Sequence, residues 1–145
     1  MPLGSTLEGD LLNLMLCAKP IANIADNASA SPSTATWTAL HTADPSSGDQ
    51  TTNEIAYTAY ARTSVVRSTA GYTVTGSGPA TASPVAAITF PACTTASTVV
   101  ASYWSVGLSS NGTGKMIGCG AISPTIALGS GVTPQLTTSS SFTMS

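Results

Sequence analysis

The sequence predicts an all-β fold, a jelly-roll-like β-sandwich of about eight short strands, with one α-helix at the N-terminus. Two observations predict this fold: short runs in which apolar and polar residues alternate, and turn signals between them roughly every 8–12 residues. The 145 residues correspond to one domain. We expect residues 1–33 to form a helix followed by an extended arm, and residues 34–145 to form the sandwich.

Residues 5–17 are the best helix candidate. Ser5 and Glu8 have the spacing of a capping box, and Pro20 ends the pattern. An apolar stripe comprises Leu3, Leu7, Leu11 and Leu14, and it is widened by Leu12, Met15 and Leu16. Because such a helix is apolar around most of its circumference, it has to be buried on more than one side. It either closes one end of its own domain or docks as an arm on another subunit.

The strands are predicted from period-two patterns. The predicted strands are residues 34–41, 60–68, 71–75, 85–90, 98–108, 115–121, 126–128, 132–136 and 142–144. The run from Asp44 to Asp49 is a strong turn signal. Asn111-Gly112, between two apolar runs, indicates a hairpin that joins the strands on either side of it.

The low charge excludes several classes of function. Only 7% of the residues are charged, with four Lys and Arg against six Asp and Glu. Four basic residues are too few to track phosphates or to hold an anionic membrane surface, so we expect no nucleic-acid or membrane partner. A single His leaves little for acid–base chemistry, so we expect no enzymatic activity, metal or cofactor. No secretory signal is apparent, and Cys17, Cys93 and Cys119 are interpreted as buried, reduced thiols.

Candidate chemical sites are few. His41 and Asp44 could belong to a Ser–His–Asp arrangement, but a G-x-S-x-G motif is missing, which favours a strand-end histidine bonded to backbone. Asp44 and Asp49 lack the spacing of a calcium loop and are interpreted as a solvated turn. Glu54 and Arg62 are expected to form an ion pair, with Arg67 in the same predicted strand as Arg62.

Two segments resemble small virion proteins of tailed bacteriophages. They are ALHTADP at residues 39–45 and TTNEIAYTAYAR at residues 51–62, and the similarity continues through residues 87–93, 107–120 and 131–135. Members of this group are often described as tail-fibre proteins, and their size and fold resemble the jelly-roll cement proteins that decorate capsids. The resemblance brings no catalytic residues with it.

The function expected from pattern and resemblance together is that of a capsid cement, or decoration, protein. Such a protein would bind the major capsid protein on the outer capsid surface and stabilise the phage head. It would self-associate as a dimer or trimer and assemble in the bacterial cytoplasm, which suits free thiols. The expected interface residues are Leu7, Leu11, Leu14, Met15, His41, Asp44, Glu54, Tyr57, Tyr60, Arg62 and Arg67.

Two alternatives remain. The first is a structural protein of the phage tail fibre or tail tip. The second is a carbohydrate-binding module that uses Trp37, Tyr60 and Trp104, because amphipathic rings serve sugar stacking as well as protein interfaces.

Overall fold

The computed structural model describes residues 5–20 and 33–144, and within them it confirms an all-β sandwich fold with one helix. The elements in chain order are α1 (Ser5–Cys17), β1 (Ala35–His41), β2 (Thr63–Val66), β3 (Tyr72–Thr75), β4 (Ala80–Pro84), β5 (Ile88–Thr89), β6 (Val100–Gly107), β7 (Met116–Ala127), β8 (Gln135–Leu136) and β9 (Phe142–Met144). The side chains of residues 5–7 lie outside the described part, as does the expected arm at residues 21–32.

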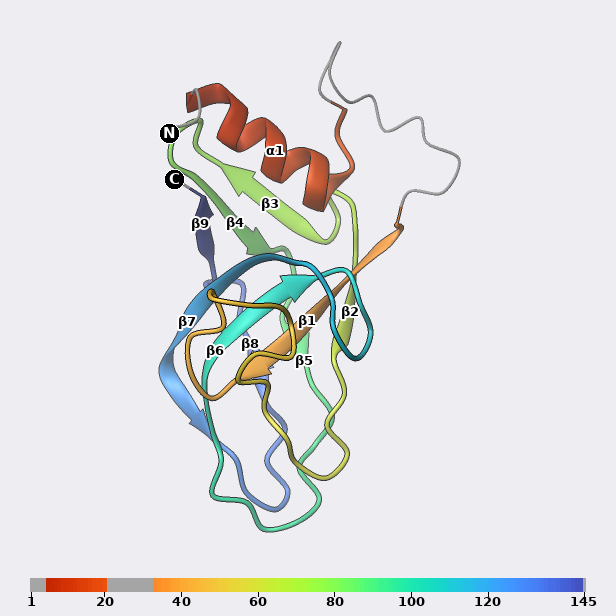
Figure 1. The fold of residues 1–145 in the computed structure, drawn as a ribbon, viewed down its shortest axis with the longest axis vertical. Coiled ribbons are helices and arrows are strands. Elements are labelled where there is room, and N and C mark those ends of the chain that lie inside the picture. Colours follow the sequence, from red (N-terminus) through yellow and green to blue (C-terminus); the bar gives the residue numbers. More distant parts are fainter. Residues whose placement is uncertain (1–4, 21–32, 145) are drawn as a thin grey trace.

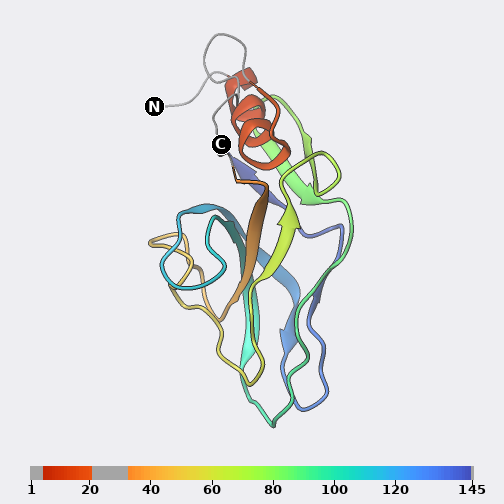
Figure 2. The same ribbon diagram turned by 90° about the vertical axis from the view of Figure 1, so that its right-hand side faces the viewer.

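The strands form three antiparallel sheets. The largest has the order β2-β1-β6-β7, and the smaller ones have the orders β3-β4-β9 and β5-β8. Helix α1 lies along β3 and β4 at one end of the molecule (Figure 1). In the perpendicular view, β5 and β8 lie on one side of the four-stranded sheet, and the long loops after β1 and β6 lie on the other (Figure 2).

The two central strands are buried on both faces, which explains why their sequence is apolar or small at nearly every position. Leu40 and Trp104 are cross-strand partners and therefore share a face. They belong to the main core, where Trp104 meets the ring of Phe142 edge-on at 5.7 Å. Their neighbours His41 and Ser105 point to the other face, and both are also fully buried. The segment 42–62 therefore acts as a second cover over the sheet.

The helix buries a different stripe from the predicted one. Leu12 and Leu16 are fully buried in the core cluster, whereas Leu11, Leu14 and Met15 are only partly buried. Gly9 allows this approach, because a Cβ there would lie 2.8 Å from the carbonyl oxygen of Gly76. The packing of α1 on β3 and β4 thus decides which of many apolar residues face inward.

Several predicted strand limits are wrong. β2 is shorter than residues 60–68, so Arg62 and Arg67 flank it instead of lying within it. Only Ile88 and Thr89 of residues 85–90 are extended in a ladder, and β4 was not predicted, because its small residues and Pro84 obscure the strand pattern. The two predicted strands at residues 115–121 and 126–128 are one strand, β7, with residues 122–125 bulging opposite Ser102.

The predicted hairpin between β6 and β7 is confirmed, but its turn is longer than two residues. The loop covers residues 108–115 and is closed by a hydrogen bond from Leu108 N to Lys115 O at 3.1 Å. Gly112 has a positive φ of 61°, which suits glycine, and its carbonyl oxygen accepts a hydrogen bond from Arg62. This tertiary contact holds the loop in a wider shape than a tight Asn-Gly turn.

Candidate functional site

The Glu54–Arg62 ion pair lies at the centre of the candidate residues. Arg62 donates from Nε to Glu54 Oε1 and from Nη2 to Glu54 Oε2, both at 2.7 Å. The Arg62 side chain is 2% exposed and that of Glu54 is 18% exposed. The expected pair is therefore confirmed, and it is a buried two-point pair whose geometry is far more specific than that of a surface contact.

Arg62 also joins two loops that are distant in sequence. Its Nη1 donates to Ser109 O and its Nη2 to Gly112 O, each at 2.9 Å. The pKa of Arg62 is raised, chiefly by the hydrogen bonds to the Glu54 carboxylate. The guanidinium thus fixes the segment 42–62 to the loop 108–115. Further buried or half-buried polar side chains lie around this pair under the same loops. We call the whole set the polar cluster; it consists of His41, Gln50, Glu54, Tyr60, Arg62 and Ser105.

Two tyrosines flank the ion pair. The Tyr60 hydroxyl donates to Glu54 Oε1 at 3.0 Å and accepts from Leu40 N at 3.1 Å. The Tyr57 hydroxyl donates to Pro91 O at 2.7 Å, and the two rings meet edge-on at 5.2 Å. Burial raises the pKa of both phenols, that of Tyr57 to about 12, so both stay protonated and keep these bonds.

His41 is held between a backbone carbonyl and a serine. Its Nδ1 lies 2.8 Å from Thr52 O, and its Nε2 lies 2.8 Å from Ser105 Oγ. Because a carbonyl only accepts, Nδ1 carries the proton and Nε2 accepts from the Ser105 hydroxyl. Burial lowers the pKa of His41, which keeps the ring neutral. The predicted bond from a strand-end histidine to backbone is therefore confirmed.

The Ser–His–Asp arrangement is not formed. Asp44 is exposed, and its Oδ1 accepts from Ser46 N at 2.8 Å instead of contacting His41. His41 and Ser105 are both 0% exposed, so a substrate cannot reach the serine hydroxyl in this conformation. Asp49 likewise accepts from Thr51, as expected of a turn, and hydrogen bonds lower the pKa of both aspartates.

Gln50 is a member of the cluster that sequence reasoning missed. Its Nε2 donates to Trp37 O at 3.0 Å, and its Oε1 accepts from Ser109 N at 3.1 Å. The amide lies on Gly107, where an added Cβ would be 2.1 Å from Gln50 Cδ. A lone glutamine after a turn has no sequence pattern that marks it as buried. The one signal was Gly107 at the end of β6, because a glycine within a strand pattern indicates that another group approaches closely.

The remaining candidates lie at α1, apart from the polar cluster. Arg67 donates from Nε to Met15 O at 2.6 Å and from Nη2 to Leu14 O. Leu11, Leu14 and Met15 are partly buried on the same helix, and Leu7 lies in its N-terminal half. The predicted interface residues therefore form two groups. One lies in and beside the segment 42–62 and includes the exposed Asp44, and the other lies on α1 and includes Arg67, which hydrogen-bonds to the helix.

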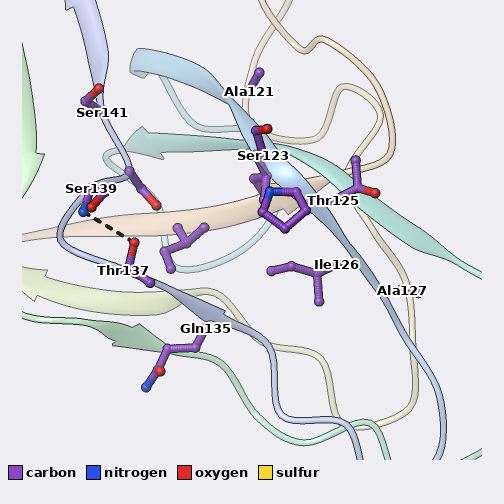
Figure 3. A pocket seen from close by; sticks show the side chains of 13 residues that line it. Ala121, Ser123, Thr125, Ile126, Ala127, Gln135, Thr137, Ser139 and Ser141 are labelled. Atoms are coloured by element: carbon purple, nitrogen blue, oxygen red, sulfur yellow. Dashed lines mark hydrogen bonds between the residues drawn. The ribbon is translucent and has the colours of Figure 1, made fainter.

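A surface groove of about 570 Å³ lies between residues 121–127 of β7 and the segment 135–141 (Figure 3). Its lining combines hydroxyl groups, the Gln135 amide and apolar side chains, and all of these residues are uncharged. Ser139 N donates to Thr137 Oγ1 at 3.3 Å at its rim. Such a lining offers hydrogen bonds but neither a general acid nor a general base.

A second groove, of about 640 Å³, follows the edge of the polar cluster. It is lined by Glu54, Ile55, Ala56, Tyr57, Tyr60, Ala61, Arg62, Ser110, Asn111 and Gly112. The predicted sugar platform of Trp37, Tyr60 and Trp104 is not formed, because Trp104 is fully buried and points to the core face of the sheet, the face opposite to that of Trp37. Tyr57 takes the place beside Tyr60 instead.

The described residues form neither a metal-ligand group nor a membrane-spanning helix. Across residues 5–20 and 33–144, no three His, Cys, Asp or Glu side chains gather as a metal-ligand group. The helix in this part of the chain is too short to cross a bilayer. Cys17 and Cys93 are buried free thiols as predicted, whereas Cys119 on β7 is only half-buried.

The sheets and the polar cluster define a small β-sandwich protein in which buried and half-buried polar side chains hold surface loops in one conformation. The family model described as "Podophage GP4 fiber I protein gp80" matches residues 12–141. The chain belongs to this family and is a phage structural protein. A search of curated proteins found no match.

Proposed function

We propose that the protein is a structural component of a phage tail fibre. The observation that carries this proposal is the match to a fibre family over residues 12–141, nearly the whole chain. The match includes the loop cover, strands β1 to β8 and the second half of α1, and it leaves out only β9 and the start of α1 among the described elements.

The architecture supports a mechanical role. Both faces of the central strands β1 and β6 are covered, and the long loops are tied down by the Glu54–Arg62 pair and by Gln50. Loops held in this way open less readily than loops with few buried contacts, which suits a part that carries mechanical load. The buried Ser105–His41 contact is part of this framework, and we assign no catalytic role to it.

Self-association is part of the proposal. Among the side chains that the structure describes, four large apolar ones are exposed, namely Val66, Val85, Val100 and Leu108, each 40–51% accessible. With only 7% of residues charged, the surface has little electrostatic repulsion to keep copies apart. We expect a dimer or trimer, which sedimentation of the purified chain over a concentration series would reveal.

The capsid cement function is the competing hypothesis, with the major capsid protein as partner. The family description names a fibre and therefore favours the tail. Quantitative mass spectrometry of purified virions distinguishes the two, because a fibre component is present in few copies and a cement protein in hundreds. Antibody labelling seen by electron microscopy should mark the tail; labelling over the whole head would overturn the proposal.

A further inference from the structure

The loop at Asn111-Gly112 brings together the groups that the chain needs to modify itself. We propose that Asn111 is a modification site, where the chain converts its own side-chain amide to a carboxylate with water as the co-reactant. The site uses the Asn-Gly pair whose sequence signal indicated a hairpin. The reaction needs no virion partner, so it does not depend on the proposed function.

The reaction passes through a cyclic succinimide. The backbone nitrogen of Gly112 loses its proton and attacks Cγ of Asn111. The Cγ–Nδ2 bond breaks, and Nδ2 leaves as ammonia with that proton. Water then adds to one of the ring carbonyls and opens the ring. Opening at Cγ gives aspartate, whereas opening at the main-chain carbonyl gives isoaspartate, in which the main chain runs through Cγ.

Both reacting groups are exposed and unbonded. Asn111 and Gly112 are exposed, and within residues 5–20 and 33–144 neither the Asn111 amide nor the Gly112 N–H has a hydrogen-bond partner. A Cβ built at Gly112 would meet nothing within 4 Å, so the surroundings are open to water. Because glycine has no side chain, nothing shields the attacking nitrogen.

Ser109 activates the attacking nitrogen through the peptide group that contains it. Its hydroxyl donates to Asn111 O at 2.5 Å, and this oxygen belongs to the same peptide unit as the Gly112 nitrogen. When the nitrogen loses its proton, amide resonance shares the negative charge with the oxygen. A donor already placed on the oxygen stabilises this charge as it develops. Ser109 therefore favours the step that forms the ring.

The residues on either side of Asn111 are held by the polar cluster. Ser109 N donates to Gln50 Oε1 at 3.1 Å. Ser109 O and Gly112 O both accept from Arg62, each at 2.9 Å. These bonds fix the Ser109 hydroxyl near its acceptor, while the exposed Asn111 side chain is free to rotate towards the nitrogen.

The same bonds make the modification structurally costly. In isoaspartate, the main chain between Ser109 O and Gly112 O is one carbon longer. Arg62 then cannot hold both oxygens in their present geometry. The loop 108–115 should therefore loosen from the segment 42–62.

Asn53 is an internal reference in the same chain. It is also exposed, but the next backbone nitrogen, that of Glu54, donates to Thr51 O at 3.2 Å. Asn53 Nδ2, the leaving group, donates to Asp44 O at 2.9 Å. The attacking and leaving groups are therefore both bonded, and the Glu54 side chain lies next to the attacking nitrogen. Asn53 should keep its amide while Asn111 reacts.

The test incubates the folded full chain in water enriched in heavy oxygen, at neutral to mildly alkaline pH, and follows each asparagine by peptide mass spectrometry. We expect Asn111 to gain one labelled oxygen and to yield both aspartate and isoaspartate. Ser109→Ala should slow this conversion by about two- to tenfold, the effect of one hydrogen bond. Ser110→Ala is the matched control and should leave the rate unchanged, because the exposed Ser110 hydroxyl has no partner in the described part of the chain.

A folded wild-type chain that keeps the Asn111 amide, or loses it no faster than that of Asn53, would overturn the proposal. Equal rates for Ser109→Ala and the wild type would overturn the role of Ser109, provided that circular dichroism shows the variant to be folded. The isoaspartate form is then purified and compared with Asn111→Asp, which has the same added charge and a normal main chain. We expect a lower thermal unfolding midpoint for the isoaspartate form; equal midpoints would overturn the loosening of the Arg62 contacts.

Discussion

The guanidinium of Arg67 donates a 2.6 Å hydrogen bond to the carbonyl oxygen of Met15, 52 residues earlier in the chain. Leu14 O accepts from the same group, and so does Ser33 O at 3.2 Å. The last carbonyls of a helix have no partner within it, and a positive charge there also interacts favourably with the helix dipole. Arg67 therefore caps α1 and fastens it to the end of β2.

Replacing Arg67 should loosen α1 before it affects the sandwich. We expect Arg67→Met to lower the free energy of unfolding by about 1–3 kcal/mol, because charge-assisted hydrogen bonds to backbone are lost. Amide hydrogen exchange should accelerate in residues 12–17 more than in β1 or β6. Arg67→Lys, which keeps the charge but not the fork of donors, should give an intermediate result. Equal acceleration throughout the chain would contradict a local clasp.

Breaking the ion pair from the Glu54 side should be costly. Glu54→Ala leaves the guanidinium of Arg62, 2% exposed, without its carboxylate, and we expect a loss of about 3–5 kcal/mol in urea unfolding. The double variant Glu54→Ala with Arg62→Met removes the unpaired charge and should lose less than the sum of the two single variants. Additive losses would show that the pair contributes no coupling energy.

The buried His41 should make stability depend on pH. Burial lowers its pKa in the folded state below the ordinary value of 6.5, so the unfolded chain binds more protons as the pH falls through about 6.5. This contribution is fully present above about pH 6.5 and is lost as the pH falls towards the folded-state pKa. His41→Asn keeps a donor for Thr52 O and should flatten the slope of unfolding free energy just below about pH 6.5. A slope identical to that of the wild type would assign the effect to another group.

The contact between β7 and β9 depends on a glycine. An added Cβ at Gly118 would lie 2.2 Å from Cε2 of Phe142, whose ring packs on Trp104. We expect Gly118→Ala to destabilise the fold by about 1–3 kcal/mol in thermal unfolding, since the ring has to move within a filled core. Gly129→Ala is the control, because its nearest neighbour would be Val132 Cγ2 at 3.9 Å. Equal stability of both variants would show that the core adapts freely at Phe142.

Short-range features were predictable from the sequence. The helix at residues 5–17 and the strand ending at His41 follow from local periodicity and turn residues, and both are observed. The Glu54–Arg62 pair was also accessible, since only eight residues separate two of the few charged groups in the chain. The weak strand β4 was missed because small residues and proline carry almost no periodic signal.

The sequence by itself determined an all-β sandwich with one helix, few charges and a compact ion pair. Only the tertiary structure decided that His41 meets Ser105, that Gln50 lies on Gly107, and that Arg67 caps α1. These contacts join residues more than 50 positions apart, and they depend on β1 lying between β2 and β6 in the sheet. Periodicity reports which way a side chain points along its own strand, whereas the identity of the neighbouring strand depends on how the whole chain packs. The groove at Tyr57 and Tyr60 arises in the same way, where two loops distant in sequence are joined by Arg62.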